Sequence, residues 1–222
     1  MPEKQALVFR IKICGVTTSQ DAHAVADAGA DAIGLNFYEK SSRYVEPQNA
    51  AEVVKDLPSS VKRVGVFVNA PLDRIQSCCQ AAMLHVVQLH GDESTGFAKS
   101  VIDQTGLPVM RAFRAKTGDE SRVAEYVDDC PGLAAVLIDA AIAGQFGGTG
   151  HIGDWEFVAT MVGRLKIPVI LAGGLNPTNV AAAIKATGAD GVDTASGVES
   201  APGNKNVREI QEFVVQAKKV RL

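Results

Sequence analysis

Two side chains with reactive chemistry share one face of the first apolar segment of the chain. The segment 9–15 reads FRIKICG, and in a strand its side chains alternate between two faces. Ile11 and Ile13 then lie on one face, and Lys12 and Cys14 lie on the other. An amine and a thiol on the polar face of a strand are difficult to explain by packing, so they predict a functional site where this strand ends.

Polar side chains also end three later apolar runs. Gln88 and His90 close one run, Asp139 closes another, and Asp193 closes the last. One large fold builds its active sites from polar groups at the carboxyl ends of many parallel strands. We therefore expect these side chains to gather around one pocket.

The elements that would position them alternate in a regular order. Short apolar runs predict strands at 9–14, 32–37, 63–68, 85–89, 108–113, 134–139, 168–172 and 190–194. Helical patterns lie at 18–29, 47–56, 71–82, 94–104, 119–129, 154–163, 177–186 and 204–219. This alternation predicts an α/β fold, a single (β/α)₈ barrel with eight parallel strands and outer helices. A doubly wound sheet is the alternative, but the glycine fingerprint typical of that fold does not follow the first strand.

The barrel is expected to span residues 1–222 as one domain, with 1–8 as a loose N-terminal extension. The net charge of −3 argues against a nucleic-acid partner. No run approaches the ~20 apolar residues of a membrane span, and the N-terminus has no apolar signal core. We expect a cytoplasmic protein without a membrane partner, and a monomer by default.

The four cysteines are not spaced as zinc ligands. Cys78 and Cys79 are adjacent, and neither Cys14 nor Cys130 forms a CxxC pair. We interpret Cys78 and Cys79 as incidental thiols in a reducing compartment.

Two segments near the carboxyl end have the pattern of anion cradles. Gly173 and Gly174 lie between a strand and a helix start, and Ser196 and Gly197 follow the last strand. Glycines let backbone N–H groups approach an anion, and the seventh and eighth loops of barrels commonly bind phosphate. Gly148, in the glycine-rich loop 144–150, can add further donors or belong to a flexible lid.

Taken together, these segments resemble the phosphoribosylanthranilate isomerase family of tryptophan biosynthesis. The matching stretches occur in order over nearly the whole chain: KICG at 12–15, GLNF at 34–37, SSRYV at 41–45, VGVFVN at 64–69, VQLHGDE at 87–93, LID at 137–139, GGTG at 147–150, LAGGL at 171–175 and SGVE at 196–199, with Pro202, Gly203 and Lys205.

The resemblance implies an aldose–ketose isomerase that carries out an Amadori rearrangement of a phosphosugar, N-(5-phosphoribosyl)anthranilate, without a cofactor or a metal ion. It implies Cys14 as the general base, Asp139 as the general acid and Arg43 as the contact for the anthranilate carboxylate, held by two parallel hydrogen bonds. We add that Lys12 can lower the pKa of Cys14, and we assign Gln88, His90, Asp193 and Lys12 to substrate positioning.

Two other functions remain possible from the sequence. Another phosphate-binding barrel enzyme, such as an indoleglycerol-phosphate synthase or a ribulose-phosphate epimerase, would need a lysine and glutamate set or metal-binding histidines at strand ends. Only His90 is a good strand-end histidine. A non-catalytic phosphosugar-binding barrel would keep the glycine cradle but lose the base or the acid, and both Cys14 and Asp139 are present.

Overall fold

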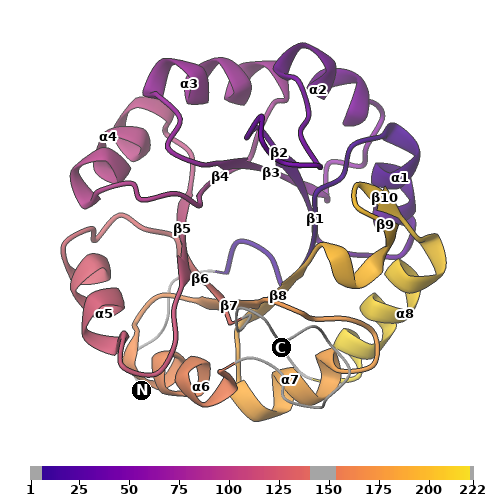
Figure 1. Ribbon diagram of the computed structural model, residues 1–222. Helices are drawn as coiled ribbons and strands as arrows, with labels where there is room; N and C mark the ends of the chain where they lie inside the picture. Colours follow the sequence, from indigo (N-terminus) through magenta and orange to yellow (C-terminus); the bar gives the residue numbers. More distant parts are fainter. Residues whose placement is uncertain (1–6, 141–153, 221–222) are drawn as a thin grey trace.

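A closed barrel of parallel strands forms the centre of the structure, a computed structural model that describes residues 7–140 and 154–220. Figure 1 shows the strands as an inner ring and the helices as an outer ring. Neighbouring strands follow the order of the chain, and β8 pairs with β1 to close the barrel. The confirmed fold is therefore the (β/α)₈ barrel and not the doubly wound sheet.

The barrel strands are β1 (Ile11–Cys14), β2 (Ala32–Asn36), β3 (Lys62–Phe67), β4 (Val86–Leu89), β5 (Val109–Arg114), β6 (Ala135–Asp139), β7 (Val169–Ala172) and β8 (Gly191–Thr194). The helices are α1 (Ser19–Asp27), α2 (Pro47–Val53), α3 (Leu72–Ala81), α4 (Thr95–Thr105), α5 (Glu120–Asp128), α6 (Trp155–Arg164), α7 (Val180–Thr187) and α8 (Val207–Lys218). Most bounds agree with the prediction to within about three residues.

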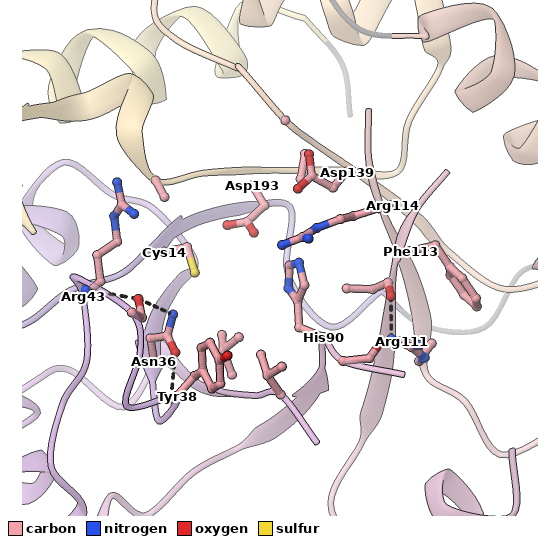
Figure 2. Close-up of a pocket in the computed structure, with 18 of the residues that line it drawn as sticks. Cys14, Asn36, Tyr38, Arg43, His90, Arg111, Phe113, Arg114, Asp139 and Asp193 are labelled. Carbon is pink, nitrogen blue, oxygen red and sulfur yellow. Dashed lines mark hydrogen bonds between the residues drawn. The ribbon is translucent and has the colours of Figure 1, made fainter. Parts of the chain in front are cut away.

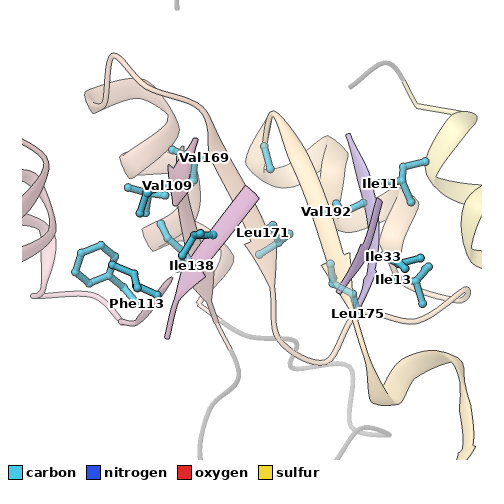
Figure 3. Close-up of a cluster of buried hydrophobic side chains, with 14 of the residues drawn as sticks. Ile11, Ile13, Ile33, Val109, Phe113, Ile138, Val169, Leu171, Leu175 and Val192 are labelled. Carbon is cyan, nitrogen blue, oxygen red and sulfur yellow. The ribbon is translucent and has the colours of Figure 1, made fainter. Parts of the chain in front are cut away.

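Side chains on the strands alternate between the barrel interior and the layer under the helices. The interior cluster consists of Phe9, Ala32, Val64, Val86, Met110, Ala112, Ala135, Leu137, Ile170 and Ala172. Ile11 and Ile13 point the other way and join the larger cluster between strands and helices, which Figure 3 shows with Ile33, Ile138 and Val192. Because helices cover the outside and side chains fill the inside, the strands are apolar on both faces.

The interior face becomes polar at the carboxyl ends of the strands. Arg114 lies two residues after Ala112, and Asp139 lies two residues after Leu137, so each shares the inward face of an interior-cluster residue. The same spacing brings Gln88 inward after Val86. The barrel thus has an apolar lower layer and a polar upper layer, and a site can form only in the upper one.

Two helices begin three residues later than predicted. Helix α7 starts at Val180 and not at 177, because Asn176 Oδ1 accepts hydrogen bonds from the Thr178 backbone and hydroxyl. Asn179 Oδ1 also accepts from the Asn176 backbone N–H. These local side-chain bonds make a turn where the first helical turn was expected.

Helix α8 starts at Val207 and not at 204, because the preceding residues form a hairpin. Strands β9 (Glu199–Ala201) and β10 (Asn204–Lys205) pair antiparallel around Pro202 and Gly203, and Gly203 has a φ of +86°. A Pro-Gly pair is a turn signal that the sequence interpretation left unused.

The predicted loose extension covers residues 1–8, and residues 1–6 of it lie outside the described part of the chain. Val8 packs partly buried against the interior cluster. That the chain 1–222 makes one domain stays a prediction. Within the described part of the chain, no helix has both the length and the apolar content to cross a bilayer.

Adjacent valines on α8 provide a test of the helix–barrel packing. Val214 is 1% exposed and Val215 is 53% exposed. We expect Val214→Ala to lower the free energy of unfolding by about 2 kcal/mol, because it removes buried methyl groups and leaves a cavity. The same change at Val215 should stay within about 0.5 kcal/mol. Urea unfolding of both variants measures this, and equal losses would contradict the packing described.

Candidate active site

A cavity of about 690 Å³ opens at the carboxyl ends of the strands. Figure 2 shows Cys14, His90, Asp139 and Asp193 turned toward a common space within it. The cavity is also lined by Arg43, Arg114, Gly173, Gly174, Thr194, Ala195 and Ser196. The strand-end residues singled out in the sequence therefore meet here, except for Lys12 and Gln88, which lie behind the cavity wall.

Cys14 and Lys12 lie side by side over a glycine of the next strand. Cys14 and Gly34 are paired in register between β1 and β2. A Cβ atom built on Gly34 would lie 2.8 Å from Cys14 Sγ and 3.1 Å from Lys12 Cε. Any larger residue at position 34 would displace these two side chains, so Gly34 provides the space that the thiol and the amine occupy.

The closure of the barrel gives Lys12 a partner. Lys12 and Asp193 are paired in register between β1 and β8, and Lys12 Nζ lies 2.8 Å from Asp193 Oδ2. Both side chains are buried, at 0% and 8% exposure. Asp193 Oδ1 is also buried and has no hydrogen-bond partner within 7–140 and 154–220. The pair thus presents one unused acceptor, and Asp193 lines the cavity.

Burial sets the direction of the pKa shifts of Cys14 and Asp193, but not that of Lys12. It raises the pKa of the Cys14 thiol, and the positive charge of Lys12 offsets only part of the rise. It also raises the pKa of Asp193 by more than Lys12 lowers it. Burial lowers the pKa of Lys12, but the charges of Asp193 and Cys14 outweigh this and leave that pKa raised. Lys12 therefore acts on Cys14 in the expected direction, against a larger desolvation effect.

His90 is held in one orientation by Gln88. Gln88 is fully buried on β4, and its Nε2 donates to His90 Nδ1 at 2.8 Å. Burial lowers the pKa of His90 to about 4, so the ring is neutral at pH 7. With Nδ1 accepting, the ring proton is on Nε2, which makes His90 a hydrogen-bond donor.

Asp139 ends β6 beside a cation that the sequence interpretation missed. Arg114 ends β5 in register with Asp139, and both line the cavity. Figure 2 shows the Arg114 side chain between Asp139 and His90. The signal was available in the sequence, because Arg114 follows an apolar run as Asp139 and Asp193 do.

The loops that were expected to bind phosphate also line the cavity. Gly173 and Gly174 have φ values of +95° and +67°, and Ser196 begins a short 3₁₀ turn after β8. Gly197 does not line the cavity, and a Cβ there would lie 1.8 Å from Leu175 O. Gly197 therefore allows the two loops to pack together. Gly148 lies outside the described residues.

Arg43 is held by a carboxylate of the β9–β10 hairpin. Its Nε donates to Glu199 Oε1 at 2.8 Å and its Nη2 donates to Oε2 at 2.6 Å. Lys205 Nζ donates to Glu199 Oε1 at 2.7 Å and to Ala195 O at 3.0 Å. Burial would raise the pKa of Glu199, but the hydrogen bonds from Arg43 and Lys205 lower it. Glu199 thus connects Arg43 to the loop that carries Ala195.

This contact occupies one edge of the Arg43 guanidinium. The Nε–Nη2 edge is bound to Glu199. The edge formed by Nη1 and the second Nη2 proton is left for a ligand. In the described part of the chain, no three His, Cys, Asp or Glu side chains are grouped to hold a metal ion.

Comparisons with known proteins agree with this geometry. A sequence model of the family described as N-(5'phosphoribosyl)anthranilate (PRA) isomerase matches residues 11–216. N-(5'-phosphoribosyl)anthranilate isomerases of Myxococcus xanthus and Geobacter sp. are 46% and 42% identical, over 96% and 95% of this chain and 98% of each relative.

Solved structures of proteins with this name are also similar to the chain. The crystal structure of phosphoribosyl anthranilate isomerase from Thermotoga maritima has a TM-score of 0.85 and 35% identity, covering 96% of this chain and all of its own. A phosphoribosyl anthranilate isomerase in complex with reduced 1-(o-carboxyphenylamino)-1-deoxyribulose 5-phosphate has a TM-score of 0.82 and 34% identity, with the same coverage. The chain therefore belongs to the N-(5'-phosphoribosyl)anthranilate isomerase family.

Proposed function

We propose that this chain converts N-(5-phosphoribosyl)anthranilate to 1-(2-carboxyphenylamino)-1-deoxyribulose 5-phosphate, with Cys14 as the general base and Asp139 as the general acid. The observation that carries the proposal is that one cavity brings together the Cys14 thiol, the Asp139 carboxyl, Arg43 and the two glycine loops. The compound bound to the solved relative has a phosphate at one end and a carboxyphenyl group at the other. The cavity lining includes the glycine loops, whose backbone N–H groups can donate, and the guanidinium of Arg43.

The first step opens the sugar ring. Asp139 gives its proton to the furanose ring oxygen, the bond from that oxygen to C1 breaks, and the nitrogen lone pair forms a Schiff base with C1. General acid catalysis of this kind contributes about 10²–10⁴-fold in rate. Asp139 has the right place for it because it ends β6 and lines the cavity.

The second step moves a proton away from the sugar. The Cys14 thiolate takes the proton from C2, and the electron pair moves through the C1–C2 bond to neutralise the Schiff base as an enolamine. The enolamine then gains a proton at C1 and loses the proton of its C2 hydroxyl, which yields the ketone. The atoms and electrons balance without an oxidant, so the rearrangement needs no redox cofactor.

Groups at the cavity wall position the substrate between these two residues. Backbone N–H groups at Gly173, Gly174 and Ser196 hold the phosphate, and the free edge of Arg43 holds the carboxylate. Asp193 Oδ1 accepts a hydrogen bond from a sugar hydroxyl. His90 donates from Nε2 as a neutral ring, and Gln88 and Lys12 act through His90 and Asp193 without touching the substrate. The monomer expected from the sequence stays a prediction.

Turnover of freshly made phosphoribosylanthranilate tests the reaction and the two roles together. We expect loss of anthranilate-type fluorescence with the wild type, and a fall in kcat of about 10²–10⁴-fold for Cys14→Ser and for Asp139→Asn. The matched controls are Cys79→Ser and Asp103→Asn, which change the same residue types on α3 and α4. These controls should keep the wild-type rate.

Full activity in either site variant would remove that residue from the mechanism. A folded wild type that binds inorganic phosphate but leaves the substrate unchanged would identify a phosphosugar-binding protein instead.

The contacts of Glu199 give it a positioning role. Its carboxylate binds Arg43 on one side and Lys205 on the other, and Lys205 also holds Ala195 O next to Ser196. One buried anion therefore orients the contact for the anthranilate end and supports the loop for the phosphate end. Glu199 itself does not line the cavity.

Glu199→Gln should separate binding from chemistry. The amide keeps the shape but loses the charge that two cations share, so we expect KM to rise about tenfold, or about 1.4 kcal/mol, while kcat changes much less. Inhibition by inorganic phosphate should weaken in parallel. Glu52→Gln is the control, because Glu52 forms an exposed ion pair with Lys55. A KM at the wild-type value would exclude the positioning role.

A further inference from the structure

The buried ammonium of Lys12 has two neighbours that compete for it. Lys12 Nζ lies 2.8 Å from Asp193 Oδ2, and Lys12 Cε and Cys14 Sγ both lie within about 3 Å of the vacant Cβ position of Gly34. The Lys12 side chain is completely buried. A buried ammonium needs an anionic partner, and here either a carboxylate or a thiolate can provide it.

The two anions must therefore affect each other. Opposite charges attract more strongly where water is excluded, so Lys12 favours the ionised form of either neighbour. When Asp193 is a carboxylate, its charge neutralises Lys12, which then stabilises a thiolate at Cys14 less. When the charge of Asp193 is removed, the Cys14 thiolate is the remaining anionic partner for Lys12.

We propose that Asp193 controls how much of Cys14 is thiolate, by holding the ammonium of Lys12 that would otherwise stabilise it. The proposal rests on the proposed function, in which the Cys14 thiolate is the base. Asp193 is then a positioning residue for Lys12 as well as an acceptor for the substrate. Burial raises the pKa of Cys14 most, while the charge of Lys12 lowers this pKa and the charge of Asp193 raises it. The direct effect of Asp193 therefore has to be separated from its effect through Lys12.

Charged groups on other elements also face Cys14. Lys205 on β10 favours the thiolate, with a smaller effect than Lys12, and Arg43 also interacts with Cys14. Both cations are bound to Glu199 on β9, which cancels part of their charge. Asp139 on β6 faces Asp193. These groups are the same in all variants below, so differences between the variants come from Lys12 and Asp193.

The direct test is the pH dependence of Cys14 alkylation by iodoacetamide, which reacts with the thiolate. Mass spectrometry of the Cys14 peptide gives the rate between pH 6 and pH 10. We expect Asp193→Asn to react about tenfold faster than the wild type at pH 8, since Lys12 is then free to stabilise the thiolate and one pKa unit is a factor of ten. Lys12→Met should react at least several-fold more slowly.

A double-variant cycle tells whether Asp193 acts through Lys12. If it does, Asp193→Asn in the Lys12→Met background should increase the rate much less than tenfold. An equal increase in both backgrounds would mean that Asp193 acts on the thiol directly and would overturn the proposal. An unchanged or slower rate in Asp193→Asn alone would also overturn it.

The chain itself contains controls for the alkylation experiment. Burial raises the pKa of Cys79 to about 11, and its peptide should titrate identically in all variants. Lys55→Met, at a lysine that is 60% exposed, should leave the Cys14 rate at the wild-type value. If circular dichroism shows Asp193→Asn unfolded, Lys12→Met decides alone: a rate equal to or above the wild type would overturn the proposal.

The titration needs no substrate, so its result is separate from the turnover assay. A tenfold change in alkylation with no turnover would establish the control of Cys14 and remove its role as the base. Turnover with an unchanged titration would keep the proposed function and remove the role of Asp193 proposed here.

Discussion

The ion pair between Lys12 and Asp193 lies at the seam where the barrel closes. The first and last strands meet there, and their register brings the two residues together. Placing a lysine inside the barrel is unfavourable unless its charge is matched, and the pair would be broken by any shift of β8 against β1. A shift of one residue would also turn every side chain of β8 to the opposite face. Closure of the fold and assembly of the site therefore depend on the same register.

The barrel separates stability from chemistry along its axis. The interior cluster fills the lower layer with apolar side chains, and on β4, β5 and β6 the inward residue two positions further on is Gln88, Arg114 or Asp139. Glycines open the space that those larger polar groups need: Gly34 accommodates Lys12 and Cys14, and Gly197 lets two loops meet. The upper layer thus contributes little hydrophobic stabilisation, and it keeps buried charges that the lower layer must compensate.

Periodicity and the polar ends of strands predicted the barrel, the inward face and the meeting of Cys14, His90, Asp139 and Asp193. They did so because parallel strands converge at one end whatever their loops do. The Glu199 contacts could not be predicted in this way, since Arg43 and Glu199 are 156 residues apart and belong to a loop and a hairpin. Pairing between two surface segments depends on their three-dimensional path, which has no periodic signal. Arg114 had that signal and was overlooked.

The raised pKa of Cys14 poses the central difficulty for the mechanism. Each unit by which burial raises it reduces the thiolate fraction about tenfold at neutral pH, while the strength of the remaining base rises by less, because Brønsted coefficients are below one. Burial alone therefore slows proton abstraction. A neighbouring ammonium opposes that loss without admitting water, and Lys12 is placed to do so. In the proposed mechanism Asp193 also binds the sugar, and because it shares the ammonium of Lys12, the proposed base Cys14 is activated less strongly.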